Sequence, residues 1–294
     1  MPRVESTRRL GPTNYQARAG DGTLIGDTLL VVTFRQEPVH LAAYDPAEGR
    51  VTDTWEVPVS EYSDSPGATT IAAYDERYVY ALMHTPAELF RFDRETETFD
   101  RLATLPTTSD RVSSCCGIEV REGRVFLSTK NDPVLYELDH EAGDLRQIGP
   151  PHPDAWKAYA LAVGEDRLYV GGGSDAYLSA VDPETGERRD ILPPQLADEA
   201  FVRSAALTAD DQLVVGVSDR LAVFDPDGPP SDATVVDVDP EGSSTGVGPL
   251  HVTDRTVYFT TSDPAYTVWA YELDTGALSA IAAPIDHGTG YLAP

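Results

Sequence analysis

The chain has 294 residues, 41% of them hydrophobic, and a formal net charge of −27. This length is compatible with one large domain or with a repeat architecture built around a substantial apolar core. A negative charge of this size repels nucleic acid and anionic membrane surfaces, so neither is expected as a partner. Residues 1–16 contain no apolar run typical of a secretory signal, and no segment approaches the roughly 20 apolar residues of a membrane span. We therefore expect a cytoplasmic protein, with secretion as the alternative if a signal segment was removed. We also expect a monomer.

One sequence phrase recurs six times along the chain. It begins with an alternating apolar run that ends at Asp, continues through a turn, and closes with a more polar run near Pro. The six phrases occupy residues 40–58, 88–106, 134–150, 177–194, 221–240 and 268–284. Their marker aspartates are Asp45, Asp93, Asp139, Asp182, Asp225 and Asp274, with spacings of 48, 46, 43, 43 and 49 residues. Asp favours the start of a turn and Gly accepts positive φ, so each phrase predicts a two-stranded hairpin.

A second hairpin is predicted ahead of the phrase, for example in "IEVREGRVFLS", "LAVGEDRLYVG" and "HVTDRTVYFTT". Four strands in each unit of about 40–50 residues are typical of a β-propeller blade. We therefore predict an all-β fold, a single β-propeller over residues 1–294 with four-stranded antiparallel blades. Six blades are favoured over seven, with the termini closing the ring. The predicted blades are 15–60, 61–106, 107–151, 152–194, 195–240 and 241–286.

The phrases "LSAVDPETGE" and "WAYELDTGAL" resemble propeller repeats of the YVTN and PQQ-like (quinoprotein-like) classes, and "LYVGGGSDAYLSAVDPETG" resembles Kelch repeats. The resemblance implies a fold and leaves the function open. PQQ-dependent alcohol dehydrogenases have eight blades and a regular tryptophan docking repeat. This chain is too short for eight blades and contains only three tryptophans. We therefore expect no cofactor.

The chain has two cysteines, Cys115 and Cys116, which are adjacent at the start of the third predicted inner strand. Adjacent Cα atoms are 3.80 Å apart, below the range of about 4.4–6.8 Å that disulfides prefer, so a bond between them would be strained. A disulfide of this kind lies over the cofactor in the PQQ-dependent enzymes. The alternatives are two free thiols with one packed between blades, a strained disulfide, or a reactive thiol. No metal site is predicted, because no second Cys or His pair has ligand spacing.

Loops that lead into the inner strands, and loops between second and third strands, are expected to meet at one mouth of the propeller channel. Both lysines of the chain fall in these loops, with arginines and aromatic residues nearby. Such a cluster could bind a carboxylate or another anion while Trp156 or Phe201 stacks against a ring. The alternative is salt bridging with loop aspartates. The predicted ligand-binding residues are Arg111, Cys115, Cys116, Lys130, Trp156, Lys157, Phe201, Arg203, His287 and Tyr291. Two further histidines, His140 and His152, are predicted to lie in solvated outer turns.

These features support three hypotheses about function. The first is a scaffold that binds a small acidic or sugar-like ligand at the channel mouth. The second is a lyase, cyclase or isomerase in which Tyr62 or His84 acts as a base and Lys157 stabilises an anion. The third is a scaffold for a protein partner. No nucleophile elbow of a serine hydrolase is present in the sequence.

Overall fold

A computed structural model describes residues 19–33, 38–60, 68–83, 87–105, 114–130, 133–238, 246–262 and 267–282. Within these residues it contains 24 β-strands and two short 3-10 helices, η1 (Pro194–Leu196) and η2 (Pro230–Asp232). The predicted all-β class is confirmed. In this part of the chain no helix has the length and apolar character needed to cross a membrane.

The described residues form two compact units, which divide between residues 147 and 148. The first unit contains β1 (Ala19–Ile25), β2 (Thr28–Thr33), β3 (His40–Asp45), β4 (Arg50–Glu56), β5 (Ala68–Ala73), β6 (Tyr78–Met83), β7 (Glu88–Asp93), β8 (Thr98–Thr104), β9 (Ser114–Arg121), β10 (Arg124–Lys130), β11 (Leu135–Leu138) and the start of β12 (Leu145–Gly149). The second contains β13 (Lys157–Val163), β14 (Leu168–Gly173), β15 (Tyr177–Val181), β16 (Arg188–Asp190), β17 (Val202–Leu207), β18 (Leu213–Val217), β19 (Arg220–Phe224), β20 (Thr234–Asp237), β21 (Gly246–Val252), β22 (Thr256–Ser262), β23 (Val268–Glu272) and β24 (Ala277–Ala282).

Consecutive strands pair antiparallel. Separate four-stranded sheets are formed by β1 to β4, β5 to β8, β17 to β20 and β21 to β24, and strands also pair in chain order within β9 to β12 and within β13 to β16. The four-stranded antiparallel blades that the repeats predicted are therefore present. The number of blades and the single-domain organisation stay predictions.

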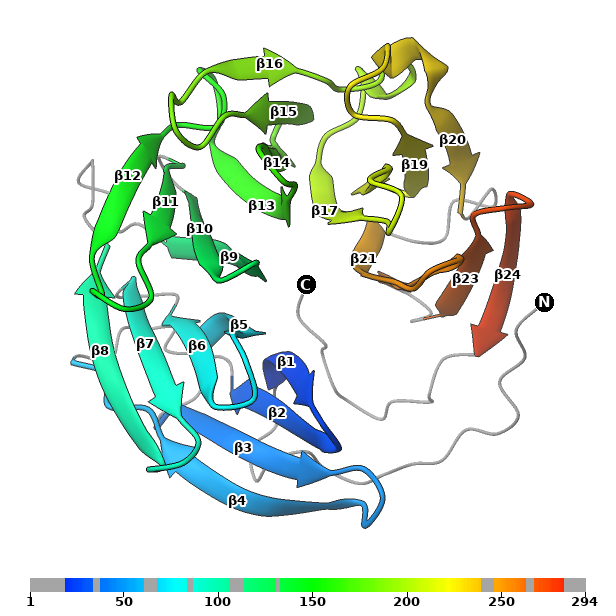
Figure 1. Ribbon diagram of the computed structural model, residues 1–294. Coiled ribbons are helices and arrows are strands. Elements are labelled where there is room, and N and C mark those ends of the chain that lie inside the picture. Colours follow the sequence, from blue (N-terminus) through cyan, green and yellow to red (C-terminus); the bar gives the residue numbers. More distant parts are fainter. Residues whose placement is uncertain are drawn as a thin grey trace. The chain divides into compact units, whose positions relative to one another are not determined.

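Burial follows the position of a strand in its group. Every residue of β14 and β15 is buried, whereas every residue of β16 is exposed. In Figure 1 the first strands of the three sheets in the first unit, β1, β5 and β9, lie side by side. The last strands, β4, β8 and β12, lie at the opposite edges of these sheets. In the second unit β13, β17 and β21 lie side by side in the same way. The middle strands thus carry the apolar core, which lies between neighbouring sheets of the same unit.

The turns after the third strands confirm most of the marker aspartates. Asp182 Oδ1 accepts hydrogen bonds from the backbone N–H groups of Glu184 (2.8 Å) and Thr185 (3.0 Å), and Gly186 has a φ of 73°. The sixth marker is wrong. There the Gly276 N–H donates to the Glu272 carbonyl at 2.8 Å, as Gly49 donates to Asp45 in the first repeat. Glu272, two residues before Asp274, therefore occupies the marker position.

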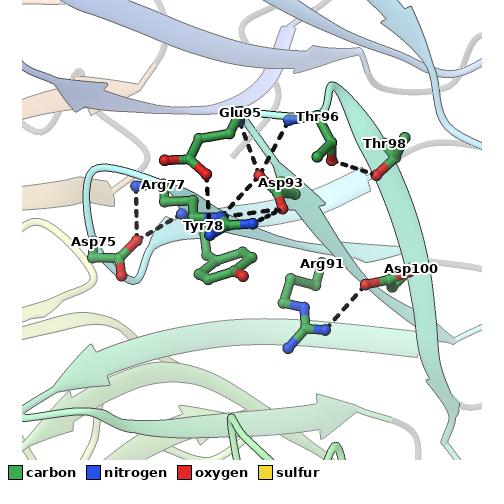
Figure 2. A network of polar contacts seen from close by, with 9 residues as sticks. All are labelled: Asp75, Arg77, Tyr78, Arg91, Asp93, Glu95, Thr96, Thr98 and Asp100. Carbon is green, nitrogen blue, oxygen red and sulfur yellow. Dashed lines mark hydrogen bonds and ion pairs between the residues drawn. The ribbon is translucent and has the colours of Figure 1, made fainter.

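In several repeats an arginine stabilises the turn after the third strand, a contact that the sequence did not predict. Arg77 precedes β6, and its Nη2 lies 2.7 Å from Asp93 Oδ2 at the end of β7 (Figure 2). The hydrogen bond from Arg77 lowers the pKa of the Asp93 carboxyl to about 2. In the second unit Arg167 pairs with Asp182 at 3.4 Å, and Arg255 pairs with Asp274 at 2.6 Å. The ion pair between the two hairpins is therefore a recurring feature of the repeat.

Each first strand contains a register irregularity near its start, where one extra residue leaves the pairing. In β13, Ala158 pairs with Gly172 and Ala160 with Gly171, so Tyr159 is the extra residue. In β17 the extra residue is Arg203. The corresponding positions in the other four first strands are Gly20, Thr69, Cys116 and the pair Gly248–Pro249. Extra residues of this kind are β-bulges, which bend a strand and redirect a side chain.

The two histidines of the outer turns, which were predicted to be solvated, are only partly exposed. His140 Nδ1 forms a hydrogen bond with the Tyr80 hydroxyl, and its ring stacks on Tyr74 with centroids 3.8 Å apart. His152 stacks on Tyr177 with centroids 5.0 Å apart. Both rings are held by aromatic side chains from strands or turns that are distant in the sequence, and a local turn signal does not predict such contacts.

Candidate functional site

Two basic and three aromatic side chains gather where β13 and β17 begin, in the second unit. The Lys157 Nζ lies 4.1 Å from the ring centroid of Trp156, 5.5 Å from that of Tyr159 and 5.4 Å from that of Phe201. The Arg203 Cζ lies 5.4 Å from the Phe201 centroid. Trp156 is 41% exposed. We call Trp156, Lys157, Tyr159, Phe201 and Arg203 the cation–aromatic surface.

The backbone at Lys157 is fixed by β14 and β15. The buried Tyr177 hydroxyl donates a hydrogen bond to the Lys157 carbonyl oxygen at 2.8 Å. A Cβ atom at Gly172 would lie only 1.7 Å from the same oxygen, so this position requires glycine. His152 stacks on the Tyr177 ring. Lys157 therefore projects from a rigid start of β13.

The segment that carries Phe201 is fixed in a similar way. A Cβ atom at Gly173 would lie 2.2 Å from the Ala200 carbonyl oxygen and 2.3 Å from Phe201 Cδ1. The Ser218 N–H donates to the Phe201 carbonyl oxygen at 3.1 Å. The triple glycine Gly171–Gly173 forms the end of β14, where it allows the chain before β17 to pack closely against the strand.

The β-bulges of β13 and β17 supply the two remaining members of the surface. Tyr159 and Arg203 are the extra residues of these strands, and both approach the ring of Phe201. The Tyr159 and Phe201 centroids are 6.2 Å apart, with a tilt of 59° between the rings. Sequence reasoning missed Tyr159. The signal that could have found it is its equivalence to Arg203 in the repeat, near the start of the first strand.

The two cations of the surface lack the acidic partners that most of the described arginines have. Within the described residues neither Lys157 nor Arg203 forms an ion pair, and the Arg203 Nε is shielded from solvent without a hydrogen-bond partner. The nearby Glu199 instead lies 3.3 Å from Arg220. The other described arginines pair with a carboxylate or donate to a backbone carbonyl; they are Arg50, Arg77, Arg91, Arg94, Arg101, Arg121, Arg124, Arg146, Arg167, Arg188, Arg189, Arg220 and Arg255.

The structure brings together four of the predicted ligand-binding residues, namely Trp156, Lys157, Phe201 and Arg203. Lys130 ends β10 in the first unit and has contacts of its own. Cys115 and Cys116 are part of β9, and Cys116 is its bulge residue, but their side chains lie outside what is described. The remaining predicted site residues also lie outside the described residues; they are Tyr62, His84, Arg111, His287 and Tyr291.

Several solved structures share the fold at low sequence identity. One is YCF48 bound to a D1 peptide, with a TM-score of 0.65 and 13% identity over 95% of this chain and 87% of that one. A second is a nidogen/laminin complex, with a TM-score of 0.58 and 12% identity over 85% of this chain and 91% of that one. A third is the extracellular domain of a putative one component system, BT4673, from B. thetaiotaomicron, with a TM-score of 0.63 and 14% identity over 86% of this chain. The present chain spans 32% of the length of that protein.

No curated protein matches the chain. A family model, PQQ_2, described as outer membrane protein assembly factor BamB, matches residues 37–280. The match includes β3 to β23 and the first four residues of β24, and with them the whole cation–aromatic surface. The chain therefore belongs to the PQQ_2 (outer membrane protein assembly factor BamB) family, and its fold is that of a PQQ-like β-propeller repeat protein.

Proposed function

We propose that this protein is a scaffold that binds a partner protein, and that the cation–aromatic surface contacts the partner. The observation that carries the proposal is the exposed Trp156, over which Lys157 is stacked on a rigid backbone. Among the described residues the large exposed hydrophobic side chains are Trp156 and Leu24. Trp and Arg dominate the binding energy of protein interfaces, because they combine large contact area with directed polar groups.

The related proteins support this class of function. The matching family is described as an assembly factor, and two of the similar structures are complexes with a peptide or a protein. At 12–13% identity these structures share the fold alone, so they do not specify a partner. A scaffold function also requires no cofactor, and the absence of a cofactor and the cytoplasmic location stay predictions.

The lyase hypothesis has less support. Of its three proposed catalytic residues, Tyr62 and His84 lie outside the described part of the chain. Lys157 lies over three aromatic rings, an arrangement that supports a role in binding. No observation on the described residues favours proton transfer over binding.

The proposal is tested by comparing partner capture by three immobilised proteins. These are the unmodified chain, Trp156→Ala and Leu24→Ala, which removes the other exposed hydrophobic side chain (63% exposed). Bound proteins from a lysate of the source cells are quantified by mass spectrometry. We expect the same partner with the unmodified chain and with Leu24→Ala, and its loss with Trp156→Ala. Retention of every captured protein by Trp156→Ala would show that partners bind elsewhere.

A further inference from the structure

We infer that the cation–aromatic surface binds a single carboxylate that lies next to an apolar group in the partner polypeptide. This inference rests on the proposed function and names the chemistry of the bound segment. Two observations carry it: the unpartnered cations Arg203 and Lys157, and the aromatic rings between and beside them.

Arg203 supplies the directional part of the site. Its Nε is shielded from solvent and has no acceptor, although buried polar groups are nearly always hydrogen-bonded. The close packing of Gly246 contributes to this shielding, since a Cβ atom there would lie 3.0 Å from the Nε. A guanidinium presents its N–H groups in a planar fork that matches the two oxygens of a carboxylate. Because the Nε itself is covered, an incoming carboxylate would bind the Nη groups of the same guanidinium, which make no hydrogen bond within the described residues.

Lys157 supplies a second positive charge near the same ring. Both cations lie about equally far from the Phe201 centroid, at 5.4 Å, so an anion near that ring can interact with either. In a chain with 49 acidic residues, two cations without acidic partners among the described residues form a local positive site on a negative molecule. The local positive charge and the negative net charge together determine which anions can bind.

The overall charge of −27 favours a singly charged group over a polyanion. The long-range field of the protein repels phosphate dianions and strongly acidic segments more than it repels one carboxylate in a neutral or basic segment. The exposed Trp156 then provides apolar area for the residue that carries or adjoins the carboxylate. The surface thus fits a polypeptide segment with an isolated carboxylate and an apolar neighbour.

The inference is tested with small probes in ligand-observed NMR titrations. Hippurate combines an aromatic ring, an amide and a carboxylate; hippuramide lacks the charge, and phenyl phosphate replaces the carboxylate with a dianion. The protein variants are Arg203→Met, Lys157→Met and a matched control, Arg188→Met. Arg188 is exposed in the same unit and donates to the Pro150 carbonyl at 2.9 Å. Arg188→Met removes one positive charge, as the other two substitutions do. Lys157→Met keeps the test valid if Arg203→Met fails to fold.

We expect hippurate to saturate the protein at about 10 mM or below, and hippuramide and phenyl phosphate to bind about tenfold more weakly. Arg203→Met and Lys157→Met should each weaken hippurate binding about tenfold, because each removes a charge-assisted contact. Arg188→Met should leave it unchanged. Equal binding of acid and amide, tighter binding of phenyl phosphate, no saturable binding, or an equal effect of Arg188→Met would each overturn the inference.

This experiment can fail independently of the proposed function. If hippurate does not bind but Trp156→Ala still abolishes partner capture, the scaffold function stands and the carboxylate assignment is wrong. If hippurate binds as expected but Trp156→Ala retains all captured proteins, the anion site stands without a role in partner binding.

Discussion

The contact between Tyr80 and His140 connects two neighbouring sheets of the first unit and should contribute measurably to stability. Tyr80 is fully buried in β6, and its hydroxyl bonds to Nδ1 of His140 in the turn between β11 and β12. Arg91 holds the same turn, since its Nη1 donates to the His140 carbonyl at 3.0 Å. Removing the hydroxyl with Tyr80→Phe leaves the ring in place and the histidine nitrogen without its partner. We expect a loss of about 1–2 kcal/mol in the free energy of unfolding.

A double-mutant cycle with His140→Phe isolates this hydrogen bond from the ring stacking. Phe preserves a ring that can stack on Tyr74 but cannot accept the hydrogen bond. The coupling energy between the two substitutions should be about 1 kcal/mol, measured by urea unfolding. Tyr169→Phe is the control, because Tyr169 is also buried in a second strand and its hydroxyl makes no hydrogen bond within the described residues.

The same contact predicts a pH dependence. Burial lowers the pKa of His140 below its ordinary value of 6.5, and the Arg91 charge lowers it further, against the opposing charges of Asp75, Glu141 and Asp139. The unfolded chain therefore takes up a proton before the folded chain does as the pH falls. The contribution is complete above pH 6.5 and is lost as the pH falls through the folded pKa. His140→Phe should flatten this part of the stability curve. Parallel curves for the two proteins between about pH 5 and 8, with no coupling to Tyr80, would refute the reasoning.

Further predictions concern one turn position and two carboxylates. Glu97 has a φ of 57° at the turn position where other repeats carry glycine, namely Gly49, Gly143, Gly186 and Gly276. Glu97→Gly should therefore raise the free energy of unfolding by about 1 kcal/mol, and Gly143→Ala should lower it by about the same amount. Glu88 is 1% exposed and accepts hydrogen bonds from the Ser60 N–H (3.1 Å), the Ser60 hydroxyl (2.7 Å) and Arg101 (2.9 Å), so Glu88→Gln should cost about 2 kcal/mol in urea unfolding. Although solvent reaches part of Glu119, desolvation by the surrounding protein, and then the Asp21 charge, raise the pKa of its carboxyl to about 7. The contribution of Glu119 to the free energy of unfolding is present below pH 4.5 and is lost as the pH rises through 7. Glu119→Gln should therefore raise the melting temperature at pH 8 and leave it unchanged at pH 4. A higher melting temperature at both pH values would contradict the raised pKa as the cause.

The features that the sequence predicts well are those encoded within a few residues. Alternation of apolar residues defines a strand, and an Asp followed by Gly four residues later defines the turn, as at Asp182 and Gly186. Even here the sixth repeat shows a limit. The segment Glu272–Asp274 offers acidic residues two positions apart, and a shift of two keeps every side chain on the same face of the strand. Alternation alone therefore cannot distinguish Glu272 from Asp274.

Contacts between repeats are harder to predict from local sequence patterns. The partners Tyr80 and His140 are 60 residues apart, and each lies in a segment that looks complete by itself. The cation–aromatic surface was partly predictable because Trp156, Lys157, Phe201 and Arg203 precede or begin first strands, whose positions the repeat fixes. Tyr159 was not, because a strict two-residue alternation ignores the bulge that redirects it.

The bulge offers a physical reason why one repeat can carry different chemistry in each copy. A bulge residue leaves the strand pairing, so its side chain can change without altering the register of its neighbours. The six equivalent positions indeed hold Gly20, Thr69, Cys116, Tyr159, Arg203 and Gly248–Pro249. Glycine, cysteine, tyrosine and arginine share no packing requirement, whereas the paired residues around them are mostly small or apolar. Residue type therefore varies most among the repeats at the position where strand pairing constrains the side chain least. Two of these variable positions, Tyr159 and Arg203, belong to the proposed binding surface.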